Sequence, residues 1–458
     1  MTLPYAFEKQ VALVAVRRAC ALTSSVFNRL VKNETLTKGD KSPVTVGDYS
    51  AQAVVNTILG RAFPADPIVG EEDAAEMRQE SNSELKSRII ALANEALTAP
   101  LGPGETSNWG LGPGQERTPE ELMDAIDRGG DQGGRTGRRW TLDPIDGTKG
   151  FLRGGQYAVC LALIVDGQVV LGLIGCPNLP VKSDEPDGRK GCIFVVVKGQ
   201  GAEQVTLSGD RSVPLTIPPV VPGTLNFLES VEAAHADLAF NNRISELLNI
   251  TRAPARMDSQ AKYGCLARGD GGVYLRMPTG TGYREKIWDH ASGSLLVEEC
   301  GGVITDSRGK SLDFGLGRSL GENYGFIAAG KDVHSQVLAA VQQALAETTL
   351  LFVGFILAVL YVARAISSRF QSTKASLEQR GITLSRDGVS LKTERRFDRD
   401  AYLDATQRGL VKALGAATVG SESHKHAFLP PADERQKHVF GVSLRRSHGN
   451  NERGEGHQ

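Results

Sequence analysis

The chain has 458 residues, and its 52 lysines and arginines against 53 aspartates and glutamates give a formal net charge of −1. With 40% hydrophobic and 23% charged residues, the composition excludes a wholly disordered chain and a protein with many membrane spans. At roughly 150 residues per domain, the length predicts two or three domains. Residues 364–458 hold 17 basic and 11 acidic side chains, so a basic tail follows an acidic body. An acidic body argues against non-specific binding to nucleic acid.

The six cysteines form no C-x-x-C pair, and most lie in apolar runs. This pattern predicts reduced, buried thiols and argues against a zinc site or a disulfide framework. The first ten residues, MTLPYAFEKQ, lack a basic stretch followed by an apolar one, so we expect no secretory signal and a cytoplasmic location.

The first third of the chain predicts a helix, a second helix and a strand. Apolar residues recur at steps near 3.6 over residues 5–31, which is typical of an amphipathic helix. A second helix is expected over 50–59, ending at Gly60, and a strand over 66–72 that runs into an acidic turn. Residues 98–138 are rich in Gly, Pro, Arg and Glu and predict an insertion of low order.

The middle of the chain predicts a hairpin-connected sheet, mixed or antiparallel. A strand followed by a tight turn is expected from Arg139 onward. The apolar runs 157–165 and 168–175 are separated only by Asp166-Gly167, which is a strong hairpin signal. Another strand is expected at 193–197.

A segment with four prolines, residues 210–224, predicts the boundary of a second α/β unit that extends over 225–347. The strands expected in this unit are 225–228, 272–275 and 325–328, and the helices are about 237–248, 290–300 and 333–346.

Residues 348–363 contain no charged side chain, and the wider stretch 348–366 approaches the ~20 residues that a membrane span needs. It predicts either a transmembrane helix or a buried apolar helix. The tail, 367–458, is expected to be largely disordered. If the stretch spans a membrane, the basic residues after it would place the tail in the cytoplasm and the body on the other side. The body has no secretory signal, however, so we expect the body to stay in the cytoplasm. Alternatively, the tail is not a natural part of the protein, and a neighbouring reading frame has been merged into the gene model.

Five acidic side chains each lie where a strand ends or a helix begins. Alone, each one is best explained as a helix cap or a turn residue. In the D-P-I-D motif, however, the proline restricts the backbone so that two carboxylates and a carbonyl can face metal ions together. Hard cations such as Mg²⁺ prefer such oxygen ligands. The five are Asp48, Glu71, Asp143, Asp146 and Asp289.

Gly147 and Thr148 follow the D-P-I-D motif directly and are expected to open a turn or helix. Their N–H groups would form an anion site of phosphate size. Metal ions, N–H donors and a hydroxyl group together favour metal-assisted hydrolysis of a phosphate ester.

The strings GEE, DPIDGTKGFLRG and WDHASG resemble the lithium-sensitive, magnesium-dependent phosphomonoesterases, which include inositol monophosphatases and fructose-1,6-bisphosphatases. The longer strings PVTVGDYSAQ, GCPNLP, MDSQAKY and YREKIWDH are similar to those of the fungal 3′(2′),5′-bisphosphate nucleotidases. The resemblance covers about residues 1–346, with gaps in 73–138 and 181–224.

The resemblance implies a mixed α/β, layered αβαβα sugar-phosphatase fold, with a larger N-terminal metal-binding domain, 1–224, and a smaller C-terminal nucleotide-binding one, 225–347. It implies two or three Mg²⁺ ions and a water-orienting or water-activating role for Asp48 and Thr148. The implied metal ligands are Asp48, Glu71, Asp143, the carbonyl of Ile145, Asp146 and Asp289. The implied substrate contacts are Thr148, His235, Ser259, Lys262, Arg276 and Asp289. Ser259 and Lys262 are spaced to share one face of a helix.

The implied reaction is hydrolysis of adenosine 3′,5′-bisphosphate to AMP and phosphate, with 3′-phosphoadenylyl sulfate as a second substrate, in a lithium-sensitive monomer that serves sulfate assimilation and salt tolerance. An inositol monophosphatase or an inositol polyphosphate 1-phosphatase is the alternative within the superfamily. A membrane-tethered scaffold without catalysis is the alternative from another class.

Overall fold

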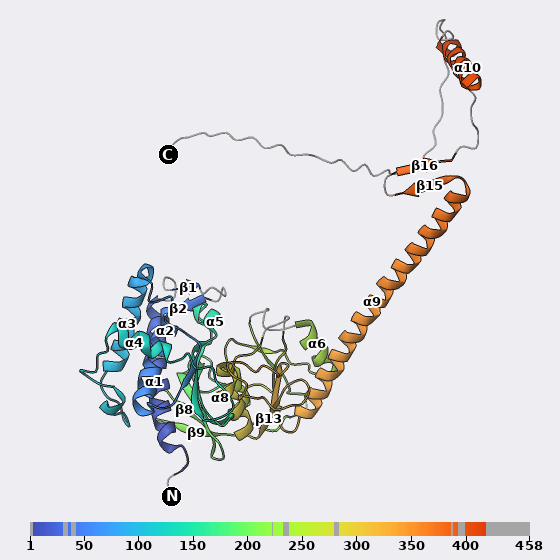
Figure 1. The fold of residues 1–458 in the computed structure, drawn as a ribbon. Coiled ribbons are helices and arrows are strands. Elements are labelled where there is room, and N and C mark those ends of the chain that lie inside the picture. The colour runs from blue at the N-terminus through green and yellow to red at the C-terminus, as the bar shows by residue number, and fades with distance from the viewer. Residues whose placement is uncertain are drawn as a thin grey trace, which may run out of the picture. The chain divides into compact units, whose positions relative to one another are not determined.

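The structure is a computed structural model that describes residues 3–30, 35–37, 43–221, 223–231, 238–278, 284–385, 388–392 and 399–417. The chain divides into two compact units, Met1–Ala358 and Val359–Gln458. Figure 1 shows the elements in chain order, from blue at the N-terminus to red.

A seven-stranded sheet with the order β3-β4-β5-β6-β7-β8-β9 organises the first unit. β3 runs parallel to β4, and the other neighbouring pairs are antiparallel. The central strands are near-continuous apolar runs, such as AVCLALIV in β5, because helices cover both faces of the sheet. The strands are β3 (Ile68–Gly70), β4 (Arg138–Asp146), β5 (Ala158–Val165), β6 (Gln168–Pro180), β7 (Lys190–Val197), β8 (Gly201–Thr206) and β9 (Ser212–Leu215).

The hairpin predicted at Asp166-Gly167 is confirmed, and it joins β5 to β6. Both residues have positive φ, 48° for Asp166 and 75° for Gly167. A two-residue turn with two positive φ angles matches the right-handed twist of the strands that it connects. β6 runs five residues beyond the predicted end, to Pro180.

Helices α1 (Ala6–Leu30) and α2 (Val46–Ala62) cover one face of the large sheet, in contact with β6 and β4 respectively. Most of the predicted amphipathic stripe of α1 is buried there, including Val11, Ala15 and Val26. α3 (Ser83–Thr98) and α4 (Pro119–Asp127) pack against α2. The remaining short elements of this region are β1 (Thr35–Thr37), β2 (Pro43–Thr45), η1 (Glu80–Asn82) and η2 (Ser107–Trp109).

Helices α7 (Ala261–Ala267) and α8 (Ile287–Glu299) cover the other face of the large sheet and separate it from a second sheet. α8 approaches β6 closely: a Cβ atom on Gly172 would lie 2.8 Å from the Cα of Ser292. Residues of both sheets and both helices share one apolar cluster. This central helical layer fixes the distance between the two sheets.

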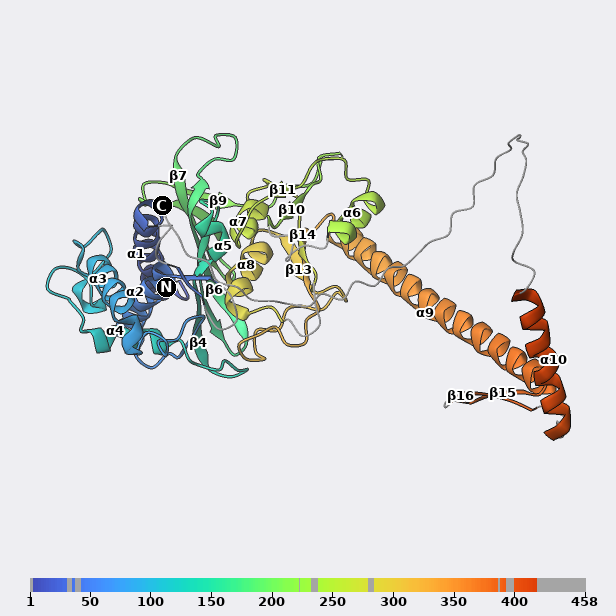
Figure 2. The same ribbon diagram turned by 90° about the horizontal axis from the view of Figure 1, so that it is seen from above.

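The second sheet has the order β11-β10-β12-β14-β13. Its outer face packs against α6 (Leu238–Leu247) and the first part of α9 (His334–Gln379). The predicted αβαβα layering is therefore confirmed, and Figure 2 shows the layers side by side. The strands are β10 (Phe227–Glu229), β11 (Ala255–Arg256), β12 (Val273–Arg276), β13 (Gly302–Thr305) and β14 (Phe326–Gly330), and the short α5 (Thr148–Leu152) follows β4.

The expected low-order insertion, 98–138, contains a regular helix. α4 starts with a capping box in which the Thr118 hydroxyl accepts from the Glu121 N–H, and the Glu121 carboxylate accepts from the Thr118 N–H. Its apolar side chains Leu122, Met123 and Ile126 are buried. The local sequence Thr-Pro-Glu-Glu is a helix start signal, which the glycine and proline content of the wider segment obscures.

The second unit includes the end of α9, the hairpin of β15 (Ile382–Ser385) with β16 (Gly388–Leu391), and α10 (Arg399–Ala417). The tail was expected to be largely disordered, but its described part contains regular helices and strands. Residues 418–458 lie outside the described residues.

Candidate active site

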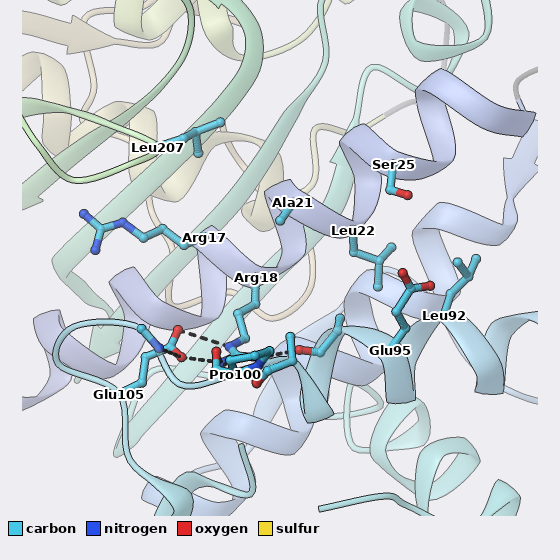
Figure 3. A pocket seen from close by; sticks show the side chains of 13 residues that line it. Arg17, Arg18, Ala21, Leu22, Ser25, Leu92, Glu95, Pro100, Glu105 and Leu207 are labelled. Atoms are coloured by element: carbon cyan, nitrogen blue, oxygen red, sulfur yellow. Dashed lines mark hydrogen bonds and ion pairs between the residues drawn. The ribbon is translucent and has the colours of Figure 1, made fainter. Parts of the chain in front are cut away.

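A pocket on the helical side of the large sheet lies away from the predicted site. It is lined by residues of α1, α3 and the loop after α3, among them Arg18, Leu22 and Glu95 (Figure 3). Arg18 forms an ion pair there with Glu105 and donates to the carbonyl of Pro100 over 3.2 Å. These interactions hold the loop against α1, and none of the predicted site residues lines this pocket.

Asp48 lies in the first turn of α2 and is almost fully buried. A carboxylate is favoured at a helix N-terminus, where the backbone N–H groups have no partners within the helix. Gln52, one turn later, lies on the same face of α2. Its amide donates to the carbonyl of Glu72 over 2.7 Å and accepts from the N–H of Glu72 over 3.1 Å. Gln52 thereby holds the segment that carries Glu71 close to Asp48.

Arg318 holds the same segment from the far end of the sequence. Its guanidinium group donates to the carbonyl of Gly70, and to the carbonyl of Asp131 over 3.0 Å. It also lies over the ring of Trp288, 4.8 Å from the ring centroid. Since Trp288 precedes Asp289 in α8, Arg318 links the Glu71 segment to the Asp289 helix.

A β-bulge at the end of β4 presents Asp143 and Asp146. Asp143 pairs with Cys160 and Asp146 with Ala158, so three steps on β4 oppose two on β5. In a regular strand, residues three apart point to opposite faces, and the additional residue removes this alternation. Pro144 cannot donate a ladder hydrogen bond, which suits a bulge.

Carboxylate oxygens of Asp143, Asp146 and Asp289 all lie within 4.8 Å of one another. They come from the end of β4 and the first turn of α8. Burial, and then the negative charges of Glu71, Asp146, Asp289 and Asp48, raise the pKa of Asp143 well above its usual range. The five carboxylates singled out in the sequence are therefore electrostatic neighbours.

The pKa values of Asp146 and Asp289 are also raised. Burial raises the pKa of Asp146 to about 6, against the opposing effects of Lys262, the Gln260 N–H and Arg276. Burial, followed by the charge of Asp146, raises the pKa of Asp289 well above its usual range. A bound cation would lower these raised pKa values and favour the carboxylate form of all three acids.

The donor set fits a hard divalent cation. The Oδ1 atom of Asp143 is buried and has no hydrogen-bond partner among the described residues. Buried carboxylate oxygens normally have a partner, and a metal ion would supply one. The carbonyl of Ile145 accepts from the hydroxyl group of Thr148 over 3.2 Å and keeps a second lone pair for an ion.

Gly147 lets a second loop approach the turn after β4. Its φ is 85°, and a Cβ atom there would lie 2.9 Å from the Cβ of Ser259. The N–H of Gln260 donates to the Asp146 carboxylate. The loop of Ser259 and Gln260 therefore lies directly on the turn that leads to Thr148.

Ser259 and Lys262 do not share a helical face, so that prediction is wrong. Ser259 precedes α7 and has a left-handed backbone, with φ of 67°. Its hydroxyl group accepts from the N–H of Ala261 over 3.2 Å, which turns the chain before the helix begins. Lys262 donates to the carbonyl of Ser259 over 2.6 Å and lies over the ring of Tyr274, 5.2 Å from the centroid. Both side chains nevertheless lie beside the carboxylate cluster, because Lys262 interacts with Asp146.

Arg276 forms the start of a buried chain of polar groups that sequence reasoning missed. Its Nε lies 3.0 Å from one oxygen of Glu285, whose other oxygen lies 3.1 Å from the Nε2 of His290. The Nδ1 of His290 lies 3.0 Å from the hydroxyl group of Tyr263. Glu285 precedes Asp289 by four residues and His290 follows it directly. This spacing around the WDH string is the sequence feature from which their contact could have been predicted.

His235, the remaining predicted substrate contact, lies outside the described residues. Arg153, on the segment that follows α5, is placed by an ion pair with Asp258 at 2.8 Å. The structure thus gathers every other predicted site residue around the end of β4.

The inositol monophosphatase family profile matches residues 110–346, which is just over half of the chain. The chain belongs to the inositol monophosphatase family. Asp143, Asp146 and Asp289 lie within the matched region, and Asp48 and Glu71 precede it. The matched region ends one residue before Glu347.

The chain is also similar to fungal and plant enzymes over nearly their whole length. The chain is 50% identical over 341 residues to the 3′(2′),5′-bisphosphate nucleotidase of Schizosaccharomyces pombe, covering 73% of this chain and 94% of that protein. It is 44% identical to the enzyme of the same name from Emericella nidulans, covering 74% and 99%, and 42% identical to that from Oryza sativa, covering 75% and 96%.

Solved structures of the family are more distant in sequence. The crystal structure of the extragenic suppressor protein SuhB from Bartonella henselae is 18% identical, with a TM-score of 0.48, and the alignment covers 73% of this chain and 98% of that one. The inositol monophosphatase of Thermotoga maritima is 20% identical, with a TM-score of 0.45, covering 73% and 96%.

Proposed function

We propose that the chain is a magnesium-dependent phosphomonoesterase that hydrolyses adenosine 3′,5′-bisphosphate to AMP and phosphate, and that 3′-phosphoadenylyl sulfate is a second substrate. The observation that carries the chemistry is the buried group of Asp143, Asp146 and Asp289, whose oxygens lie within 4.8 Å of one another. The relatives named 3′(2′),5′-bisphosphate nucleotidase, up to 50% identical, support the choice of substrate.

The carboxylate cluster would hold two or three Mg²⁺ ions. Its proposed ligands are the side chains of Asp48, Glu71, Asp143, Asp146 and Asp289 and the carbonyl of Ile145. Bound Mg²⁺ supplies Lewis acidity and neutralises charge on the phosphoryl group. The raised pKa values of Asp143, Asp146 and Asp289 support this role, because a bound cation would favour the ionised form of all three groups.

Asp48 and Thr148 would orient and deprotonate the attacking water. The Thr148 hydroxyl donates its proton to the carbonyl of Ile145, so its oxygen is free to accept from a water molecule. The water oxygen then attacks phosphorus in line, the bond between phosphorus and the ribose oxygen breaks, and that oxygen takes up a proton. We expect no cysteinyl-phosphate intermediate, since the cysteines of the chain are all buried thiols, with the pKa of Cys160 raised by burial.

Lys262 and Arg276 would bind the substrate's phosphate groups and discriminate a bisphosphate from a monophosphate. Both cations lie beside the cluster, since each lowers the pKa of Asp146. Arg276 is held by Glu285, which presets the direction of its guanidinium fork. Ser259, on the loop that packs on Gly147, and His235 are the other proposed nucleotide contacts.

An inositol monophosphatase or an inositol polyphosphate 1-phosphatase is the second candidate, because the metal-binding residues would serve either substrate. The family match itself favours neither. The cationic side chains Lys262 and Arg276 favour a substrate with a second phosphate group. We further propose that the catalytic part of the chain, residues 1–347, faces the cytoplasm, acts as a monomer and serves sulfate assimilation and salt tolerance.

A substrate panel tests this proposal. Phosphate release is measured with Mg²⁺ from adenosine 3′,5′-bisphosphate, 3′-phosphoadenylyl sulfate, inositol monophosphate and inositol 1,4-bisphosphate. We expect kcat/KM to be highest for the two adenylyl substrates. Turnover of the inositol phosphates alone would support the second candidate, and no turnover of any substrate would support a scaffold.

A further inference from the structure

Helix α9 changes character at Glu347. Before this residue, α9 packs on the five-stranded sheet and buries Val337, Val341 and Ala344. Glu347 forms an ion pair with Arg243 of α6, with 2.8 Å between the Arg243 Nε and a carboxylate oxygen. No residue of α9 after Ala344 is buried in the described chain. The packed part of the helix therefore ends at this ion pair.

The next part of α9 is apolar on all sides. Residues 348–368 read TTLLFVGFILAVLYVARAISS and contain a single charged side chain, Arg364. Large apolar side chains are exposed on every side of the helix: Leu350 is 71% exposed, Phe355 67% and Tyr361 74%. Successive helical residues point about 100° apart, so the run Leu350–Val353 alone surrounds the helix with apolar groups. We call residues 348–368 the apolar segment.

We propose that the apolar segment spans a lipid bilayer. Its 21 residues, at ~1.5 Å per residue, measure about 31 Å, which matches the hydrocarbon core of a bilayer. Arg364 lies four residues before the end of the segment, where a long cationic side chain can reach the headgroups. Arg369, Lys374 and Arg380 follow and suit the headgroup region.

Helix α1 shows that length and hydropathy alone do not carry this proposal. Residues 6–28 of α1 also reach the length and hydropathy of a span, but 61% of its most apolar stretch is buried. Val11, Ala15 and Ala19 of α1 are inaccessible to solvent. The corresponding stretch of α9 is 0% buried, although its mean hydropathy is higher, at 2.3 against 1.2. α1 therefore belongs to the core, whereas the apolar segment has no protein environment in the described chain.

The distribution of apolar groups favours lipid over a protein partner. A helix that docks in a groove, or against a second copy of itself, needs one apolar stripe and keeps polar residues on the opposite side. The apolar segment has no polar side, so a single partner would leave much of it in water. A bilayer covers every side of a helix at once. As a span, it would place the catalytic unit and the basic tail on opposite faces of the membrane.

Flotation of the full-length chain with phosphatidylcholine vesicles tests the proposal. Because uncharged lipid is used, attraction of the basic tail to an anionic surface does not contribute. We expect the wild-type chain to float and to stay with the vesicles in alkaline carbonate. Release by carbonate or by high salt, or a soluble oligomer of defined size without detergent, would overturn the proposal.

Two matched variants test which residues are responsible. The triple substitution Phe355→Glu, Leu357→Glu, Val359→Glu places charges at the centre of the apolar segment and should reduce the floating fraction at least tenfold. The control, Leu403→Glu, Leu410→Glu, Val411→Glu, changes equally exposed apolar residues of α10 and should float as the wild type does. If the first variant floats normally, or if the control fails as severely, the proposal is wrong.

Trypsin added to sealed vesicles distinguishes a span from a helix that lies on the surface. A span protects either the catalytic unit or the tail of each molecule, so protected fragments longer than the apolar segment should remain. Complete digestion on both sides of the segment would contradict a span. None of these measurements depends on enzymatic activity, so they stand or fall apart from the proposed nucleotidase function.

Discussion

Lys262 is a residue whose charge state can change near neutral pH. It is buried, and this burial lowers the pKa of its ammonium group to about 8, although Asp146 opposes the shift. A lysine with this pKa is charged at pH 7 and neutral at pH 9. If it binds a substrate phosphate, substrate capture must weaken as the pH rises through about 8.

We therefore predict that kcat/KM for adenosine 3′,5′-bisphosphate falls above about pH 8, because a charge-assisted contact worth roughly 1.5–3 kcal/mol is lost. The Lys262→Arg variant keeps its charge and should remain active to higher pH. Lys262→Ala should be weak throughout and should lose more activity on a bisphosphate than on a monophosphate. A wild-type profile that is flat to pH 9.5 would show that Lys262 does not bind phosphate.

Asp146 predicts a second pH dependence, in the stability of the protein without metal. Its pKa in the folded protein, about 6, is above the ordinary value for an aspartate, so it favours the folded state at low pH. This contribution is lost as the pH rises through about 6. We predict that Mg²⁺ raises the Tm more at pH 7.5 than at pH 5, as measured by thermal unfolding with and without EDTA. An equal rise at both pH values would contradict the assignment of Asp146 as a ligand.

At the scale of the elements, the turn after β4 depends on the loop that precedes α7. Gly147→Ala would force a side chain into a left-handed backbone and against the Cβ of Ser259, 2.9 Å away. Gly199→Ala is the matched control, since Gly199 has φ of 74° and nothing within 4 Å of an added Cβ.

Both alanine variants should lose about 1 kcal/mol of stability from backbone strain. Only Gly147→Ala should also lose activity, by tenfold or more, because it displaces Thr148 and the Asp146 contact with Gln260. Chemical denaturation and steady-state kinetics measure the two effects. Equal activity in the two variants would show that the close packing on Gly147 does not position the site.

Local sequence decides some elements of the fold and long-range contacts decide others. The hairpin at Asp166-Gly167 and the helix over 5–31 were predictable because neighbouring residues determine them. The bulge at Pro144 and the left-handed Ser259 were not, since contacts with β5 and with Gly147 determine both. For the same reason the sequence indicated the carboxylates of the site but missed Gln52 and Glu285, which act by holding other site residues in place.

At the scale of the whole molecule, we expect the catalytic part of the chain, residues 1–347, to be separable from the residues that follow. The family match ends at residue 346, and α9 loses its packed face at the same point. The site residues that the structure describes lie between Asp48 and Asp289.

We predict that a chain ending at residue 347 is soluble and fully active, because it retains the ion pair of Arg243 with Glu347 and all buried residues of α9. Its Tm should lie within a few degrees of that of the full-length chain in detergent. Aggregation or inactivity of the shortened chain would mean that the apolar segment belongs to the core.

The most direct test of the metal-dependent mechanism is the turnover of adenosine 3′,5′-bisphosphate by the wild-type chain and by Asp143→Asn, with Mg²⁺ and with excess EDTA. We predict AMP and phosphate from the wild type with Mg²⁺ only, and a loss on the order of 10³-fold in Asp143→Asn, because charge stabilisation of the transition state is removed. The thermal stability of this variant should match or exceed that of the wild type, and the exposed control Asp187→Asn should behave normally. Near-normal turnover by Asp143→Asn, or wild-type turnover in EDTA, would contradict the mechanism.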